Sequence, residues 1–191
     1  SMLGRGQKNG ALDLQAHNLR TWTHDRHQTV DDRPFGGGPG MVMKVEPIHE
    51  ALMALKLRKK DGSPTATAKK TRILLTSAKG RPFTQQEAVR LSTYDRLVFI
   101  CGRYEGVDER VAEHLVDEEI SVGPYVLTGG ELAAMIVTDA VSRLRPNVLG
   151  KQESLTMESH TDEGVLEYPH YTRPEIYKQG KTEWKIPDIL L

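Results

Sequence analysis

Two glycine-bearing stretches have the residue types and spacing of ligand-binding loops: CGRYEGVDER at 101–110 and VGPYVLTGGE at 122–131. Glycine lets the backbone turn tightly and come close to a bound molecule. Neither stretch matches G-x-G-x-x-G or a P-loop, so the pattern does not indicate a dinucleotide or nucleoside triphosphate site. If the two loops lie at the same end of a sheet, they should form a ligand crevice.

A third stretch, DDRPFGGGPG at 31–40, is a loop by composition. It could be a flexible connection, or a surface rich in accessible backbone that binds a substrate. In the second case Asp31 or Asp32 would accept hydrogen bonds from a base edge. Guanine, with donors at N1 and N2, suits such a carboxylate.

Other reactive side chains are less informative. His24 and His27 could suggest a metal pair, but no third ligand accompanies them, so surface histidines are expected. Cys101 is the single cysteine, which excludes an intramolecular disulfide and favours a cytoplasmic protein. It ends an apolar run, and a buried strand-end thiol is expected there rather than a nucleophile.

The elements that would position these loops alternate between strands and helices. Strands are predicted at 72–77, 97–101 and 125–127, with another, alternating segment at 12–16. Helical spacing begins at Pro47 and again at Glu131, and Thr84 to Glu87 forms a capping box before a further helix. This order predicts an α/β fold with a mostly parallel sheet and flanking helices. The helix after Glu131 should have one face lined by Leu132, Met135, Ile136, Asp139, Ala140 and Arg143.

The charge is balanced overall but unevenly distributed. The 191 residues carry 26 basic and 26 acidic side chains, so a global basic signal for nucleic acid is absent. A basic group between 56 and 72 lies in an expected loop, where it could contact phosphates. An acidic group between 105 and 119 is expected to form a solvated surface. No segment has the length and apolarity of a membrane span, and no signal peptide is visible.

Four blocks together carry a family resemblance: DDRPFGGGPGM at 31–41, CGRYEGVDER, VGPYVLTGGE, and PHYTRPE at 169–175. In this order they resemble the bacterial tRNA (guanine(37)-N1)-methyltransferases, members of the SPOUT superfamily, whose C-terminal trefoil knot cannot be deduced from periodicity. The resemblance implies methyl transfer from S-adenosyl-L-methionine to N1 of the guanine at position 37 of tRNA, with S-adenosylhomocysteine as product. It also implies a homodimer with active sites at the dimer interface, and a possible use of Mg²⁺.

The resemblance also assigns residues to the cofactor and to the tRNA. Asp31, Asp32 and Arg33 lie in the segment that binds the tRNA. Two departures from the family leave the details open: Pro124 replaces an aspartate, and Ala78-Lys79 replaces Pro-Gln. Cofactor contacts are expected, largely through the backbone, from Thr76, Ser77, Gly80, Gly102, Tyr104, Glu105, Val122, Gly123, Pro124, Tyr125, Val126, Leu127, Gly129 and Gly130.

Transfer to N1 requires a base, because N1 of guanine carries a proton at neutral pH. By resemblance Glu158 occupies the position of the family's catalytic aspartate. One extra residue before Gly164 leaves Asp162 as a competing candidate. Arg143 takes the position of the arginine that stabilises negative charge growing toward O6, although an ion pair with Asp139 one turn earlier is an alternative.

Three regions are expected: a knotted catalytic domain that binds S-adenosylmethionine (1–150), a flexible linker (151–168), and the start of a truncated, helical tRNA-binding domain (169–191). The first strand of the family also has no counterpart, and Ser1-Met2 resembles a cloning remnant. Two other functions stay open. One is a dimeric fragment that binds S-adenosylmethionine without catalysis, and the other is a SPOUT methyltransferase that acts on ribosomal RNA.

Overall fold

The computed structural model describes residues 1–149 and 165–190. The chain divides into two compact units, Ser1–Gln152 and Glu153–Leu191. Each is described by itself. Within the described residues no helix has the length and apolar character needed to cross a membrane.

The first unit is built on a three-stranded sheet with β3 (Thr71–Pro82) at its centre. β4 (Arg96–Cys101) and β5 (Glu118–Ser121) pair with β3 on either side, both in parallel. The middle of β3 is apolar on both faces and almost fully buried, as expected for a central parallel strand. This confirms the predicted α/β fold with a parallel sheet.

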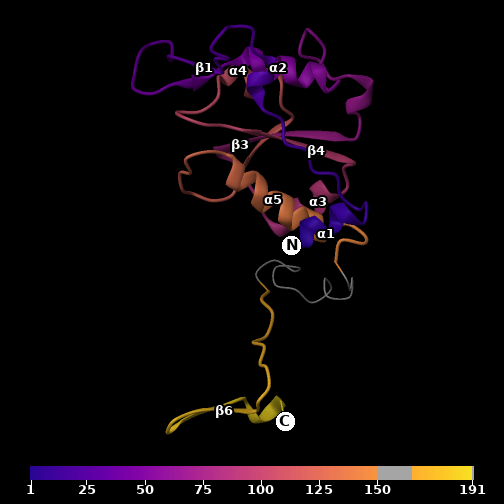
Figure 1. The fold of residues 1–191 in the computed structure, drawn as a ribbon, viewed down its shortest axis with the longest axis vertical. Helices are drawn as coiled ribbons and strands as arrows, with labels where there is room; N and C mark the ends of the chain where they lie inside the picture. Colours follow the sequence, from indigo (N-terminus) through magenta and orange to yellow (C-terminus); the bar gives the residue numbers. More distant parts are fainter. Residues whose placement is uncertain (150–164, 191) are drawn as a thin grey trace. The chain divides into compact units, whose positions relative to one another are not determined.

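Helices cover both faces of this sheet (Figure 1). On one face lie α2 (Val45–Ala54) and α4 (Glu109–His114), whose apolar residues form a core with Ile73 and Leu75. On the other lie α3 (Gln85–Ser92) and α5 (Glu131–Arg143), which pack with Leu74. Alternate side chains of one strand thus enter two separate cores, because successive residues of a strand point to opposite faces.

Side chains cap the start of two helices, and the first of these caps is the one that the sequence predicts. The Thr84 side chain accepts a hydrogen bond from the Glu87 backbone N–H at the start of α3. The Asp108 carboxylate accepts one from the Arg110 N–H at the start of α4. Both satisfy a backbone donor that has no partner within the helix. The α4 cap matters for the site, because it ends the loop 102–108.

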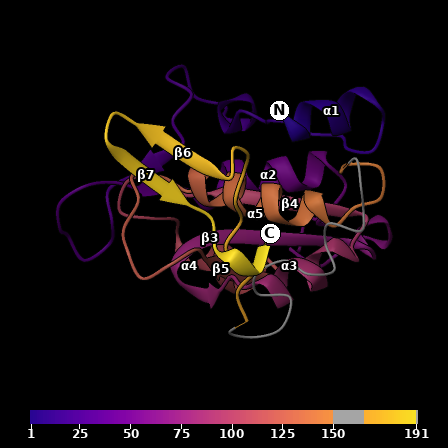
Figure 2. The same ribbon diagram turned by 90° about the horizontal axis from the view of Figure 1, so that it is seen from below.

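Smaller elements complete the two units. In the first unit these are α1 (Met2–Lys8), η1 (Leu19–Trp22), η2 (Ala66–Ala68), and an antiparallel ribbon of β1 (Asp31–Asp32) and β2 (Val42–Met43). The second unit contains the antiparallel ribbon of β6 (Ile176–Gln179) and β7 (Thr182–Lys185), followed by η4 (Asp188–Leu190). Figure 2 shows β6 and β7 side by side.

Two strand predictions were wrong. Residues 125–127 lie in the loop between β5 and α5, and Val126 is 91% exposed. The segment that pairs with β3 on the side opposite β4 is β5, Glu118–Ser121, which has a mixed rather than an apolar composition. Residues 12–16 are not a strand either, because no described strand pairs with them. Local apolar patterns do not reveal which segment finds a hydrogen-bonding partner.

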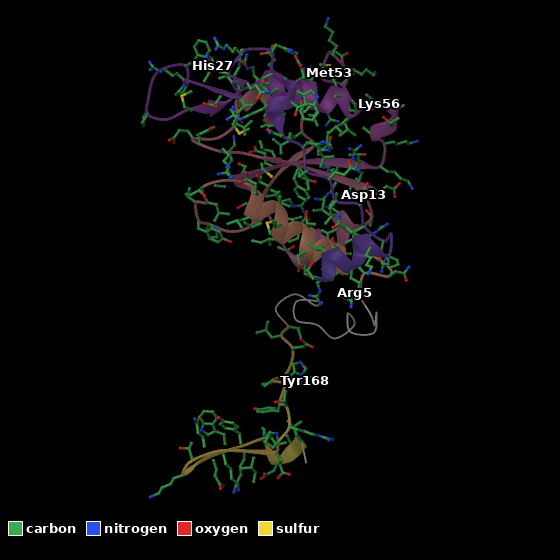
Figure 3. The ribbon with its side chains drawn as sticks, viewed as in Figure 1. Arg5, Asp13, His27, Met53, Lys56 and Tyr168 are labelled. Atoms are coloured by element: carbon green, nitrogen blue, oxygen red, sulfur yellow. The ribbon has the colours of Figure 1, made fainter. Side chains whose placement is uncertain are left out.

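The predictions for the two charged groups were also partly wrong. Arg58 is buried and forms an ion pair with Asp117, 2.6 Å between Nη2 and Oδ1. Glu118 lies between two arginines, Arg72 and Arg90, rather than in solvent. Lys56, at the edge of the unit in Figure 3, is exposed as expected.

Candidate functional site

The candidate site is a cavity of about 440 Å³ where β4 and β5 end, beside the irregular middle of β3. Three loops form it: 76–79 within β3, 102–107 after β4, and 121–130 between β5 and α5. The register of β3 on β5 shifts between Thr76 and Arg81, so β3 bulges at the cavity. Parallel strands place their carboxyl ends at one edge, which is where ligands bind in open α/β sheets. The size suits a small organic molecule.

Most residues predicted to bind the cofactor line this cavity. They are Thr76, Ser77, Gly102, Tyr104, Glu105, Val122, Gly123, Tyr125, Val126, Leu127, Gly129 and Gly130. Gly80 and Pro124 are not among its lining residues. Gly80 has a packing reason instead: a Cβ there would lie 2.5 Å from the Ile120 backbone nitrogen. The structure brings the three loops together, and their contacts with a cofactor stay a prediction.

Gly130 shows why one wall of the cavity needs glycine. A Cβ at this position would overlap the Thr76 hydroxyl and lie 2.9 Å from Cα of Cys101. The Gly130 N–H also donates a hydrogen bond to the Gly102 carbonyl, at 2.8 Å. The start of α5 is therefore packed against β3 at Thr76 and against the end of β4 more closely than any side chain would allow.

Charged side chains that the sequence analysis did not assign to the site also line the cavity. Nζ of Lys79 lies 2.7 Å from both carboxylate oxygens of Glu109, and 3.8 Å from Oε1 of Glu119. The Glu109 hydrogen bond raises the pKa of Lys79. Oε2 of Glu119 is buried and has no hydrogen-bond partner within residues 1–149 and 165–190, so a ligand or water must satisfy it. The sequence could have indicated Glu119 only if β5 had been recognised as a strand, because alternate residues of a strand share a face and Ser121 also lines the cavity.

A second ion pair joins two of the loops. Nε of Arg103 lies 2.8 Å from Oε1 of Glu131, and both side chains are about half exposed. Arg103 also forms an isolated antiparallel bridge with Gly129. These contacts hold the loop after β4 to the start of α5, which should limit how far the cavity can open.

Cys101 behaves as a strand-end thiol. Burial raises its pKa to about 11, and the nearby Glu131 carboxylate adds to this effect. At neutral pH the thiol is therefore protonated, and a protonated thiol is a poor nucleophile. That the cysteine takes no part in the chemistry stays a prediction.

Residues 31–41 lie beside the loop that follows β4. Asp31 and Asp32 form strand β1, and residues 33–41 make the glycine-rich loop. The Glu105 N–H donates to the Met41 carbonyl at 3.0 Å, which joins the two loops directly. Arg33 and Asp32 are exposed, and the Asp32 carboxylate accepts a hydrogen bond from its neighbour's backbone N–H at 2.7 Å. Asp32 is therefore open to solvent, Asp31 is half-buried, and neither lines the cavity.

Arg143 is not brought to this cavity within one chain. It is the last residue of α5, whose first turn lies at the cavity, and twelve residues of helix span about 18 Å. Glu158 and Asp162, the two candidate bases, lie outside the described residues. The cavity of one chain is thus formed by the expected cofactor loops, while Arg143 lies at the far end of α5 and both candidate bases lie outside the described residues.

His24 and His27 are both exposed, as the surface-histidine prediction expects. His24 contacts Glu50 at 2.8 Å and is exposed, while His27 lies at the edge of its layer in Figure 3. Among residues 1–149 and 165–190 no group of three or more His, Cys, Asp or Glu side chains is placed to hold a metal ion.

Comparison with known proteins gives this geometry its context. The chain matches, over residues 1–191, the family model described as tRNA (Guanine-1)-methyltransferase TrmD. The chain belongs to this family. Similar proteins named tRNA (guanine-N(1)-)-methyltransferase come from Geobacter sp., 50% identical, and Dehalococcoides mccartyi, 48% identical. Each match covers the whole chain, and 71% and 72% of the relative respectively. A relative from Shewanella loihica is 52% identical over 90% of this chain and 66% of its own.

Membership of the family confirms the resemblance drawn from the four sequence blocks. All four lie within the matched residues, and three of them lie within residues 31–131. The 101–110 and 122–131 blocks supply two of the three cavity loops, and the 31–41 block supplies the glycine-rich loop bonded to one of them. Particular residues of this cavity can therefore be related to the function of the family.

Proposed function

We propose that this chain is a tRNA methyltransferase that uses S-adenosyl-L-methionine to methylate N1 of guanine in tRNA, at position 37. Relatives named tRNA (guanine-N(1)-)-methyltransferase are 50% and 48% identical to this chain in sequence. The observation that carries the proposal is the cavity formed by three glycine-bearing loops at the carboxyl ends of parallel strands. The sheet and helices also suit the knotted SPOUT arrangement, and a cytoplasmic location remains a prediction.

The lining of the cavity fits S-adenosylmethionine. Glycines in two of its loops, at 102, 123, 129 and 130, leave backbone accessible in its wall, and Glu119 offers a buried acceptor without a partner among the described residues. We expect backbone groups of 122–130 to hold the adenosine, and Tyr104 and Glu105 to lie near the methionine end. When bound, the cofactor supplies a methyl group on a positively charged sulfur and leaves as S-adenosylhomocysteine.

The chain's own residues would then prepare the guanine. A Glu158 carboxylate oxygen would take the N1 proton, so that the freed electron pair can form the new N1–carbon bond. Arg143 would donate hydrogen bonds toward O6, where negative charge develops as the proton leaves. Asp31, Asp32 and Arg33 would hold the tRNA beside the cavity, and the second unit would add contacts to it. Mg²⁺ is implied by the family, but the described residues contain no cluster fit to hold it, so no step is assigned to it.

We infer a homodimer with each site built from both chains. The outer face of α5 supports this, because Leu132, Met135 and Ile136 are 56%, 64% and 46% exposed while Ala133 and Val137 are buried. An exposed apolar helix face next to a cavity is typical of an interaction surface. Since Arg143 lies about 18 Å along α5 from the cavity of its own chain, a two-fold dimer could bring it to the partner's cavity.

A complementation experiment tests this arrangement. Gly129→Val should remove cofactor binding, and Arg143→Ala should remove catalysis. If the two chains are mixed at random, half of the dimers are mixed, and each of these keeps one intact site of two. The mixture should recover about a quarter of the unaltered activity. No recovery, with mixed dimers demonstrated by mass spectrometry, would contradict sites shared between chains.

The central test of the function is single-turnover methylation of a tRNA transcript with labelled S-adenosylmethionine. We expect transfer to a transcript with guanine at position 37 and none to a matched transcript with adenine there. Glu158→Gln should lower the rate by about 10²–10⁴-fold with little change in cofactor affinity, whereas Asp162→Asn should not. The reverse result would assign the base to Asp162. Cofactor binding without transfer would favour a non-catalytic fragment, and transfer to ribosomal RNA instead would favour the other alternative.

A further inference from the structure

Backbone hydrogen bonds join the glycine-rich loop and β2 to the loop after β4, although only the loop after β4 lines the cavity. Glu105 N–H donates to Met41 O at 3.0 Å, Met43 N–H donates to Gly106 O at 2.9 Å, and Asp108 N–H donates to Met43 O at 3.0 Å. Met43 and Val107 also form a parallel bridge. The two loops flank β1 and α4, which lie at the same end of the unit in Figure 1. A shift of one loop must therefore move the other.

Gly40, in the glycine-rich loop, lies against the side chain of Glu105, which lines the cavity. Its φ of +81° is in the left-handed region, which favours glycine. A Cβ at Gly40 would lie 2.5 Å from Cγ of Glu105 and 2.8 Å from Cδ. The Glu105 side chain therefore lies directly over Gly40, in space that only a glycine leaves open.

Within residues 1–149 and 165–190 no other group fixes the Glu105 carboxylate. No hydrogen bond or ion pair joins it to another described side chain, unlike its neighbours Arg103 and Asp108, which are both paired. Glu105 lines the cavity and is otherwise exposed. Its direction thus depends on the surface that Gly40 provides.

We propose that Gly40 is a positioning residue: it seats the Glu105 carboxylate at the cavity, so that the loop expected to serve the tRNA also sets the affinity for the cofactor. This inference rests on the proposed function. S-adenosylmethionine carries two positive charges, on its sulfonium and its amino group, and a carboxylate held nearby favours both. Because Glu105 is exposed, its side chain can move aside at little cost, so displacement should change affinity rather than folding.

The chain offers a matched control. Gly36, in the same loop, has a nearly identical φ of +84°, but a Cβ there meets no atom within 4 Å. Gly36→Ala and Gly40→Ala therefore carry the same backbone cost, and only Gly40→Ala displaces Glu105. The measurement is titration calorimetry with S-adenosylhomocysteine and with S-adenosylmethionine, without tRNA, together with the melting temperature of each variant.

We expect Gly40→Ala to weaken cofactor binding by about tenfold, the typical effect of losing one charge-assisted hydrogen bond. Gly36→Ala should bind within about twofold of the unaltered chain, and both should melt at about the same temperature. Glu105→Ala should cause the same loss as Gly40→Ala, and the double variant should lose no more. S-adenosylmethionine, with its additional sulfonium charge, should lose more affinity than S-adenosylhomocysteine.

The calorimetric results distinguish a failure of the proposed function from a failure of the positioning role of Gly40. If the unaltered chain binds no cofactor, the proposed function fails, and this inference fails with it. If the unaltered chain binds but the two alanine variants have equal affinity, only the positioning role is refuted. Additive losses in the double variant would also refute it. Should Gly40→Ala fold poorly, Glu105→Ala alone must still weaken binding about tenfold at an unchanged melting temperature, and its failure to do so would refute the role.

Discussion

The buried ion pair between Arg58 and Asp117 should contribute strongly to the stability of the first unit. The Arg58 side chain is 4% exposed and that of Asp117 is 19% exposed. Arg58 also donates from Nε to the Leu115 carbonyl at 2.9 Å, and Asp117 accepts from the Ile73 N–H at 2.7 Å. The pair thus joins the segment that follows α2, the start of β3 and the segment between α4 and β5.

Arg58→Met keeps much of the apolar volume but leaves a carboxylate with one backbone donor and a carbonyl without its partner. Removing one member of a buried pair costs about 3–5 kcal/mol. Because Asp117 retains some contact with water, we expect about 3 kcal/mol. For a unit of this size, that corresponds to a fall in melting temperature of about 6–12 °C.

Urea denaturation followed by circular dichroism would measure the change in the free energy of unfolding. Asp95→Asn is the matched control, because Lys70 and Asp95 are 75% and 64% exposed and 3.7 Å apart, and such pairs contribute about 0–1 kcal/mol. Replacing Arg58 and Asp117 together by methionine and leucine should recover part of the loss, since no buried charge is left alone. A loss for Arg58→Met no larger than that of Asp95→Asn would refute this reasoning.

Three further predictions concern single residues near the sheet. Burial raises the pKa of Glu118, but hydrogen bonds from Arg72 and Arg90 outweigh this and hold it below the ordinary 4.5. Glu118→Gln should therefore destabilise the protein at neutral pH, and the difference in melting temperature should shrink as the pH falls below 4.5 and through the lowered pKa of the native carboxylate; a difference independent of pH would contradict this. Cys101, with a pKa of about 11, should react with iodoacetamide far more slowly at neutral pH than free cysteine does, and a rate equal to that of free cysteine would count against its burial. Gly130→Ala should cost about 1–3 kcal/mol of stability and most of the cofactor affinity, because the added methyl group meets backbone at Cys101; calorimetry showing unchanged binding would exclude the close approach.

The sequence predicted the loops of the site better than the strands that carry them. Glycine pairs such as Gly129 and Gly130 mark places where backbone must approach other atoms, and this requirement is local. The contact between Gly130 and the end of β4 explains why no larger residue fits. The strand at 125–127 was wrong because pairing in a sheet depends on which segment lies beside β3, and in this fold it is the mixed segment Glu118–Ser121.

The helix at α5 shows a second limit of sequence patterns. The face of Leu132, Met135 and Ile136 has helical periodicity, but it is the exposed face, and the core takes Ala133 and Val137 instead. Periodicity reveals that a helix has an apolar face, not which partner covers it. Likewise, the contact of Gly40 with Glu105 joins residues 65 positions apart, so no local pattern could indicate it.

The net charge gave little guidance on RNA binding, because many of the charged side chains pair with one another within the protein. Asp117, Glu118 and Glu87 form ion pairs with Arg58, Arg72 and Arg90 inside or beside the core, so these charges are not available to a partner. A net charge of zero counts such internal pairs together with exposed side chains. What a tRNA would meet is the exposed part alone, which includes lysines of the 56–70 segment. For this chain, the charges that could steer RNA therefore have to be counted by exposure, because composition gives paired and exposed charges equal weight.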